Sequence, residues 1–124
     1  MQKVFNEGRH AAEFLLWEQG ITYSRDNIVI VSGAGILKAG TVLGKITTGG
    51  KYKPSTATGS DGAQTAAAVL LYDVDATSAD VKVAAITRGA EVNGKILAYD
   101  ATVDDDAKKA AKAVQLAAVG IIVR

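Results

Sequence analysis

The sequence contains no cysteine, and it has only one proline, one histidine and one tryptophan among its 124 residues. Without cysteine the chain forms no disulfide and offers neither a thiolate ligand for a metal ion nor a thiol nucleophile. Charge of one sign is not in excess either, because 14 basic and 13 acidic residues leave a formal net charge of +1. This balance is too small for a surface that binds nucleic-acid phosphates, so we expect no nucleic-acid partner.

Long apolar runs are also missing. No run approaches the roughly 18 apolar residues that span a bilayer, and the first ten residues lack the apolar core of a secretory signal. We therefore expect no membrane partner and synthesis in the cytoplasm. Hydrophobic residues still make up 48% of the chain and charged residues 22%, which is typical of one folded globular domain.

Residues 1–27 differ from the rest of the chain and predict an extended N-terminal arm. Four large apolar side chains follow one another between polar stretches, and such a cluster packs either on its own core, as a short helix, or on a partner. Both interpretations stay open at this point. In the arm hypothesis the partner contacts are the large apolar side chains of this segment, namely Phe5, Phe14, Leu15, Leu16, Trp17 and Tyr23.

Residues 28–124 predict a body rich in short strands. Runs of β-branched and small apolar residues at 28–31, 41–46, 66–72 and 81–87 are separated by glycine-rich turns. Asn93-Gly94 is a favourable hairpin turn. About five strands in this length indicate a small sandwich or a bent-hairpin, β-clip-like barrel, so the fold class is mainly β.

One C-terminal helix is expected at about residues 104–119. Asp104, Asp105 and Asp106 suit its positive N-terminal end and provide a cap, and Gly120 ends it. A stripe of small apolar residues at helical spacing should lie against the sheet; it comprises Ala107, Ala110, Ala111, Val114, Ala117 and Ala118. The apolar residues 121–123 predict a final strand.

The sequence offers little catalytic chemistry, and we expect no catalytic, metal or cofactor site. His10 is the only histidine, and nothing near it in sequence would orient it as a base or a ligand. Three consecutive aspartates at a helix start point in different directions, so capping explains them without a cation. Two alternatives remain: a small β-barrel carrier or ligand-binding module with Lys95 at a hairpin tip, and a hydrolase using Asp73, Asp75 or His10.

Several short motifs occur together in a specific order. They are EFLL at 13–16, SRD at 24–26, AGTVLGK at 39–45, KY at 51–52, DG at 61–62, AVL at 68–70, DAT at 75–77, RGAEVN at 88–93 and GIIVR at 120–124. In this order and spacing the chain resembles the phage head decoration proteins related to the protein that stabilises the lambda capsid, in a prophage-type branch.

The resemblance implies a structural virion protein with no catalytic residues and a bent β-ribbon fold. Such a protein is made in the host cytoplasm and then occupies the outer surface of the expanded capsid. It stands there as a homotrimer on local three-fold axes, binds the major capsid protein through its N-terminal arm, and cements the shell.

Overall fold

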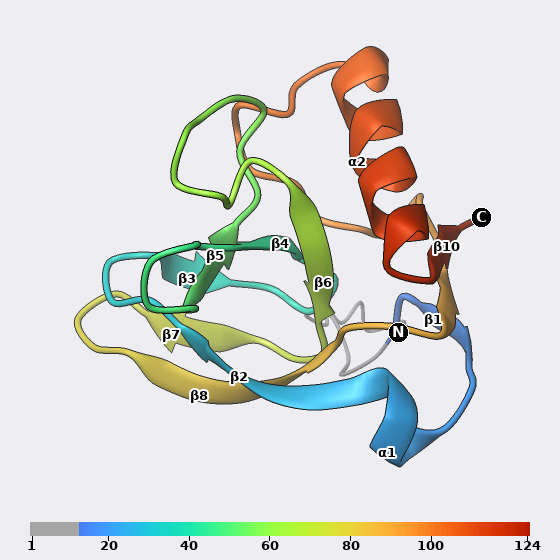
Figure 1. Cartoon of the computed structure of the whole chain (residues 1–124), viewed down its shortest axis with the longest axis horizontal. Coiled ribbons are helices and arrows are strands. Elements are labelled where there is room, and N and C mark those ends of the chain that lie inside the picture. The colour runs from blue at the N-terminus through green and yellow to red at the C-terminus, as the bar shows by residue number, and fades with distance from the viewer. Residues whose placement is uncertain (1–12) are drawn as a thin grey trace, which may run out of the picture.

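The computed structural model describes residues 13–124 and is mainly β, as the sequence predicts (Figure 1). In chain order its elements are β1 (Leu15–Glu18), α1 (Ile21–Ser24), β2 (Arg25–Ile30), β3 (Gly35–Leu37), β4 (Val42–Lys45), β5 (Tyr52–Pro54), β6 (Ala66–Leu70), β7 (Val74–Ala76), β8 (Val81–Ile86), β9 (Ala90–Val92), α2 (Asp106–Ala118) and β10 (Ile121–Val123).

A closed five-stranded barrel forms the centre of the molecule, in the order β2-β5-β4-β6-β8. Strand β2 pairs with β8 in antiparallel fashion along its whole length, from Arg25 opposite Ile86 to Ile30 opposite Val81. Alternate residues of β2 point inward, so Ile28 and Ile30 are buried among the core side chains. Closure removes the exposed edges that a small open sheet would leave.

Glycine is required on β4 because the chain passes another backbone closely there. A Cβ at Gly44 would lie 2.0 Å from the carbonyl oxygen of Ala63. That carbonyl accepts a hydrogen bond from Ser55 Oγ at 2.7 Å. The loop between β5 and β6 is thereby held against the barrel.

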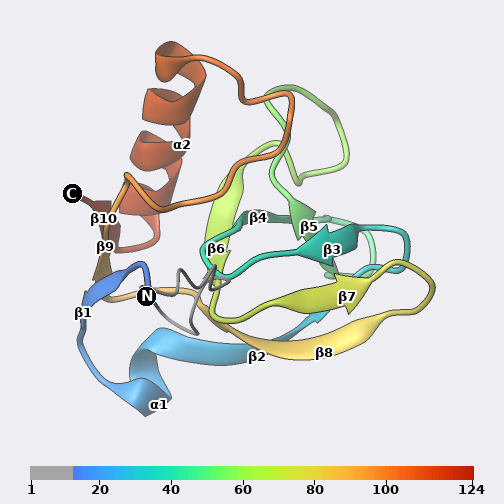
Figure 2. The same cartoon turned by 180° about the vertical axis from the view of Figure 1, so that it is seen from behind.

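A second layer consists of the three-stranded sheet β1-β9-β10 with α2 packed beside it (Figures 1 and 2). Strand β1 is antiparallel to β9, and β10 is parallel to β9. Phe14, Leu116 and Ile121 are fully buried in the core cluster beneath this layer. Asn93-Gly94 does form a turn, in which Asn93 Oδ1 accepts from the Lys95 amide at 3.0 Å. It joins no hairpin, because β9 is paired with β1 and β10 instead and the chain continues to a bridge between Thr41 and Ala98.

The strand pairing involves part of the predicted arm, residues 1–27. Strand β1 and the start of β2 are hydrogen-bonded parts of the two sheets, so the body includes Phe14 and the residues after it. The physical reason is that the β-branched and apolar residues of β9 and β8 offer ladders for both strands. The rest of the predicted arm, residues 1–12, lies outside the described residues.

Helix α2 begins and ends as predicted but faces the other way. Asp105 is the N-cap, and its Oδ1 accepts from the Lys108 amide at 2.8 Å. The predicted inner stripe is exposed, whereas Lys112 and Leu116 are buried against the body. Lys112 is tolerated there because its Nζ donates to the carbonyl oxygens of Thr56 at 2.6 Å and Gln64 at 2.5 Å.

Candidate functional site

Four large apolar side chains lie exposed within eight residues of one another on β1 and α1. Ile21 is 66% exposed, and about half of the surface of each of the other three is exposed. We call this surface the apolar corner; it consists of Leu16, Trp17, Ile21 and Tyr23. In both views α1 lies at the lower end of the molecule, far from the N-terminal end of α2, and β1 lies beside β9 and β10 (Figures 1 and 2). Clustered exposed apolar groups of this kind mark interaction surfaces.

Backbone hydrogen bonds to the β8–β9 turn hold the corner in place. The Gly89 carbonyl accepts from the Gln19 amide at 2.8 Å and from Ser24 Oγ at 3.0 Å. The Thr87 amide donates to the Ser24 carbonyl at 2.9 Å. Gly89 has φ +61°, and a Cβ there would come within 2.8 Å of the Tyr23 ring. Glycine thus permits both the turn and the close approach of Tyr23.

A bidentate ion pair ties β1 to β2 across the corner. Arg25 Nε donates to Glu18 Oε2 at 2.9 Å, and Arg25 Nη2 donates to Glu18 Oε1 at 2.7 Å. Two parallel hydrogen bonds of this kind fix the relative orientation of the side chains as well as their distance. The chain reversal through α1 is thereby closed at its base.

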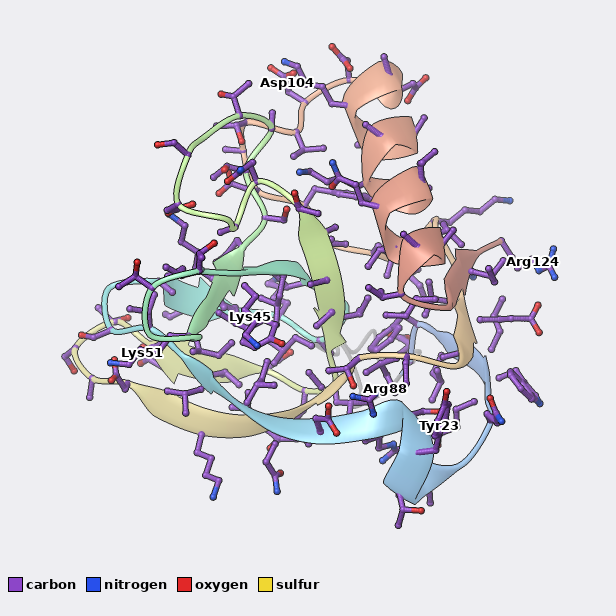
Figure 3. All side chains as sticks on the ribbon, viewed as in Figure 1. Tyr23, Lys45, Lys51, Arg88, Asp104 and Arg124 are labelled. Carbon is purple, nitrogen blue, oxygen red and sulfur yellow. The ribbon has the colours of Figure 1, made fainter. Side chains whose placement is uncertain are left out.

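Arg88 provides a second tie, to α1 itself. Its Nη1 donates to the Tyr23 carbonyl at 2.5 Å, and its guanidinium carbon lies 5.7 Å from the centroid of the Tyr23 ring. The side chains of Tyr23 and Arg88 lie next to each other in Figure 3. Arg88 Nη2 also pairs with Asp26 Oδ2 at 2.5 Å. The hydrogen bond from Arg88 lowers the pKa of Asp26, and the same contact raises the pKa of Arg88.

The outer face of the three-stranded sheet extends the corner. Trp17 and Ile122 are both cross-strand neighbours of Glu91, one on each side of β9. Ile122 is partly exposed, and Glu91 accepts from Arg124 Nε at 2.6 Å. Apolar surface with a satisfied ion pair at its margin is typical of the core and rim of a protein interface.

The structure separates the residues that the sequence grouped in the arm. Leu16, Trp17 and Tyr23 are exposed on β1 and α1, whereas Phe14 is 1% exposed and belongs to the core. Phe14, which we predicted as a partner contact, lies in one core cluster with Leu116 and Ile121. Leu15 packs partly against the same cluster. Phe5 lies outside the described residues.

Sequence reasoning missed Ile21. It lies between Gly20 and polar residues, four positions after Trp17, and this isolated position gave it no weight in a search for apolar clusters. A signal was present nonetheless, because a single large apolar residue within a polar stretch that follows an apolar cluster is a candidate for the same surface.

The residues named in the hydrolase and carrier alternatives form local hydrogen bonds or lie in turns. Asp73 Oδ1 accepts from the Ala39 amide at 2.8 Å, and Asp75 Oδ1 accepts from the Thr77 amide and hydroxyl, which lowers the pKa of Asp75. Lys95 is exposed, but its turn is not the tip of a β-hairpin. His10 lies outside the described residues.

Residues 13–124 show neither a metal-binding cluster nor a membrane-spanning helix. Within that range no group of three or more histidine, cysteine, aspartate or glutamate side chains is arranged to hold a metal ion. No helix in the same range has the length and apolar character needed to cross a membrane.

The comparisons with known proteins agree with the sequence resemblance. None of the curated proteins compared with the chain gave a match. A family model described as "Bacteriophage lambda head decoration protein D" matches residues 4–121, which is nearly the whole chain. That family consists of structural proteins rather than enzymes. The chain therefore belongs to the family of the bacteriophage lambda head decoration protein D, the structural proteins that decorate the phage capsid.

Proposed function

We propose that this protein binds the outer surface of the expanded capsid as a homotrimer, contacts the major capsid protein through its apolar corner, and cements the shell. The observation that supports this proposal is the corner itself: Trp17, Ile21 and Tyr23 are exposed on a turn that is fixed by several polar ties. A preformed apolar surface binds with little loss of conformational entropy.

The energetics favour a contact that is weak alone and strong in a trimer. Complete burial of one large apolar side chain contributes about 1.5 to 3 kcal/mol. The side chains of the corner are already partly covered, so a single corner gains only part of that, and association itself costs several kcal/mol. Three linked corners raise the effective affinity without any new kind of contact.

The N-terminal segment is proposed to extend this contact. Phe5 belongs to the part of the predicted arm that precedes the core residue Phe14. Phe14 anchors the chain to the body, and β1 follows as an edge strand of its sheet. An edge strand offers unpaired backbone groups to an extended partner segment next to the apolar side chains.

The test is binding of the purified protein to expanded heads that lack it. Trp17→Ser and Ile21→Ser, alone and together, should each weaken binding several-fold, and the double variant should abolish it at concentrations that saturate the wild type. Tyr72→Ala is the control, because Tyr72 is also an exposed aromatic residue but lies between β6 and β7, outside β1 and α1.

A second experiment deletes residues 1–12 and leaves the described body intact. This truncated protein should fold and bind heads more weakly than the full chain. Full binding by the double corner variant would overturn the assignment of the corner. Full binding by the truncated protein would overturn the contribution of the arm.

A further inference from the structure

The outer face of α2 is apolar and exposed. Its six residues at helical spacing all lie at the surface, and Val114 is 72% exposed. We call this face the α2 stripe; it comprises Ala107, Ala110, Ala111, Val114, Ala117 and Ala118.

The orientation of α2, with Lys112 buried and the apolar stripe exposed to water, is unfavourable for an isolated chain. A helix on a protein surface ordinarily turns its apolar side inward and its charged side outward. Here a lysine is 2% exposed and satisfied by two carbonyl groups, while the apolar stripe faces outward. The helix cannot rotate to bury the stripe without leaving those carbonyls unsatisfied, so the stripe stays available for a partner.

A complementary surface lies on another part of the same molecule. A groove of about 350 Å³ runs between β3 and the segment that follows the Asn93 turn. Ile36, on its wall, is 74% exposed, the highest value among the large apolar side chains of residues 13–124. We call this site the β3 groove; its apolar walls are Ala34, Ile36, Leu37, Pro54, Ala98 and Tyr99.

We propose that the α2 stripe of one copy of this chain packs into the β3 groove of the next copy. No residue of α2 lines the groove, although Lys109 of α2 lies over the ring of Tyr99, one of its walls, 5.5 Å from the ring centroid. The two surfaces are neighbours that share no residue, so both can be engaged at the same time. Contacts between two different patches join copies head to tail, and such contacts close into a ring when the rotation allows it. The stripe-to-groove contact rests on the proposed function in one respect: the number of copies in the ring, three, is taken from the proposed homotrimer.

The position of the stripe favours a second copy over the capsid as its occupant. The helix α1, which carries Ile21 and Tyr23 of the corner, and the N-terminal end of α2 lie at opposite ends of the molecule in both views (Figures 1 and 2). A shell surface that contacts the corner would therefore not reach the start of the stripe. A neighbouring copy standing beside the first one would.

The size of the stripe favours a ring over a dimer through α2. A helix of 13 residues is about 20 Å long, so the stripe alone covers a few hundred Å². A stable interface buries about 800 Å² on each partner. In a ring every copy engages two surfaces, a stripe and a groove, and the small side chains of the stripe allow close approach of the helix to the groove walls.

Opposite charges lie at the edges of the two surfaces. Lys38 lines the groove and is exposed, and Asp106 begins the helix beside the stripe. Asp100 also lines the groove, but its Oδ2 accepts from the amide and the hydroxyl of Thr102. Neither Lys38 nor Asp106 has an ion-pair partner among residues 13–124. Such a pair at the margin of an interface favours one orientation over its reverse.

Cysteine cross-linking tests the proposal directly, because the natural sequence contains no cysteine. Val114→Cys and Ile36→Cys are produced as separate proteins, mixed and treated with a short thiol cross-linker in the absence of capsids. The mixture should give heterodimers, and the double variant should give covalent trimers. Cross-linking of Val114→Cys to itself in preference to Ile36→Cys would overturn the stripe-to-groove contact.

A charge placed in the stripe tests the energetics. Ala111→Glu should weaken self-association at least tenfold in sedimentation equilibrium, while Ala79→Glu, at an exposed loop position, should leave it unchanged. Equal self-association of wild type and Ala111→Glu would overturn the proposal, as would a wild-type protein that stays monomeric. Both readouts are made without heads. They therefore separate failure of this contact from failure of capsid binding, which the corner variants report.

Discussion

The guanidinium of Arg88 covers the ring of Tyr23, 5.7 Å from its centroid, and donates a hydrogen bond to the Tyr23 carbonyl. These two residues are 65 positions apart in the sequence, and the contact joins the β8–β9 turn to α1. It gives an exposed aromatic ring a defined orientation, which is the property that a preformed binding surface requires.

We predict that Arg88→Ala weakens capsid binding several-fold and has little effect on stability. Exposed ion pairs and exposed cation–π contacts contribute little to stability, because solvent screens them. Arg88→Ala should instead reduce the conformational order of the apolar corner. Binding isotherms with heads and thermal unfolding check both parts, with Lys82→Met on the exposed side of β8 as the control. Normal binding by Arg88→Ala would show that the corner does not depend on this tie.

The same cluster predicts a pH dependence at the acidic end. The hydrogen bond from Arg88 lowers the pKa of Asp26 below its ordinary value of 3.8. A carboxyl group with a lowered pKa in the folded state adds stability above 3.8, and this contribution is lost as the pH falls through the folded-state pKa. Asp26→Asn removes the titrating group. The difference in unfolding free energy between wild type and Asp26→Asn should therefore shrink on acidification, and a difference that stays constant would contradict the lowered pKa.

Sequence patterns predicted where helices and strands occur better than they predicted which face of each element is buried. The strands at 28–31, 41–46, 66–72 and 81–87 and the capped helix were expected from local residue patterns and are present. Local patterns set turns, caps and strand propensity, so these features do not depend on the rest of the fold. The expected mainly β class follows from them.

The orientation of α2 could not be predicted in this way. It depends on carbonyl groups at Thr56 and Gln64, which the folded chain brings to Lys112 from 56 and 48 positions away. A lysine at that position looks like a surface residue until those partners are known. The sequence alone therefore favoured the opposite face.

The division of the apolar cluster between core and surface was equally hidden. Phe14 is buried and Trp17 is exposed because β1 pairs with β9 in one register, with an irregularity between Leu15 and Trp17. A register shift by one residue would exchange inward and outward positions. The sequence of four adjacent apolar residues does not indicate which register the strand adopts, and so does not indicate which of the four are buried.

Lys112 provides a prediction at alkaline pH. Lys112→Met should destabilise the protein by about 2 to 4 kcal/mol, because two carbonyl groups lose a charged donor. Burial lowers the pKa of Lys112 below its ordinary value of 10.5. The unfolded chain then binds more protons between the folded-state pKa and 10.5, so the wild type should gain stability relative to Lys112→Met as the pH rises through that range.

Denaturant unfolding at several alkaline pH values measures this difference. Lys108→Met is the matched control on the same helix, because the contact with Asp104 raises the pKa of Lys108. Its relative contribution should instead be lost as the pH rises through its folded-state pKa. Parallel behaviour of the two variants would show that Lys112 does not titrate as a buried group.

Gly44 provides the sharpest test of the barrel packing. A Cβ at this position would lie 2.0 Å from the Ala63 carbonyl oxygen and 2.6 Å from its carbon, and backbone atoms cannot yield as the end of a flexible side chain does. Gly44→Ala should therefore displace the β5–β6 loop, weaken the hydrogen bond from Ser55 Oγ to Ala63, and destabilise the fold by about 2 to 4 kcal/mol. Gly20→Ala is the control, because a Cβ there meets only Tyr23 Cβ at 4.0 Å. The denaturation midpoint reports the stability, and hydrogen exchange should locate the disturbance in residues 55–63. If Gly44→Ala unfolds at the same denaturant concentration as Gly20→Ala, the loop does not pack against β4 as closely as the structure shows.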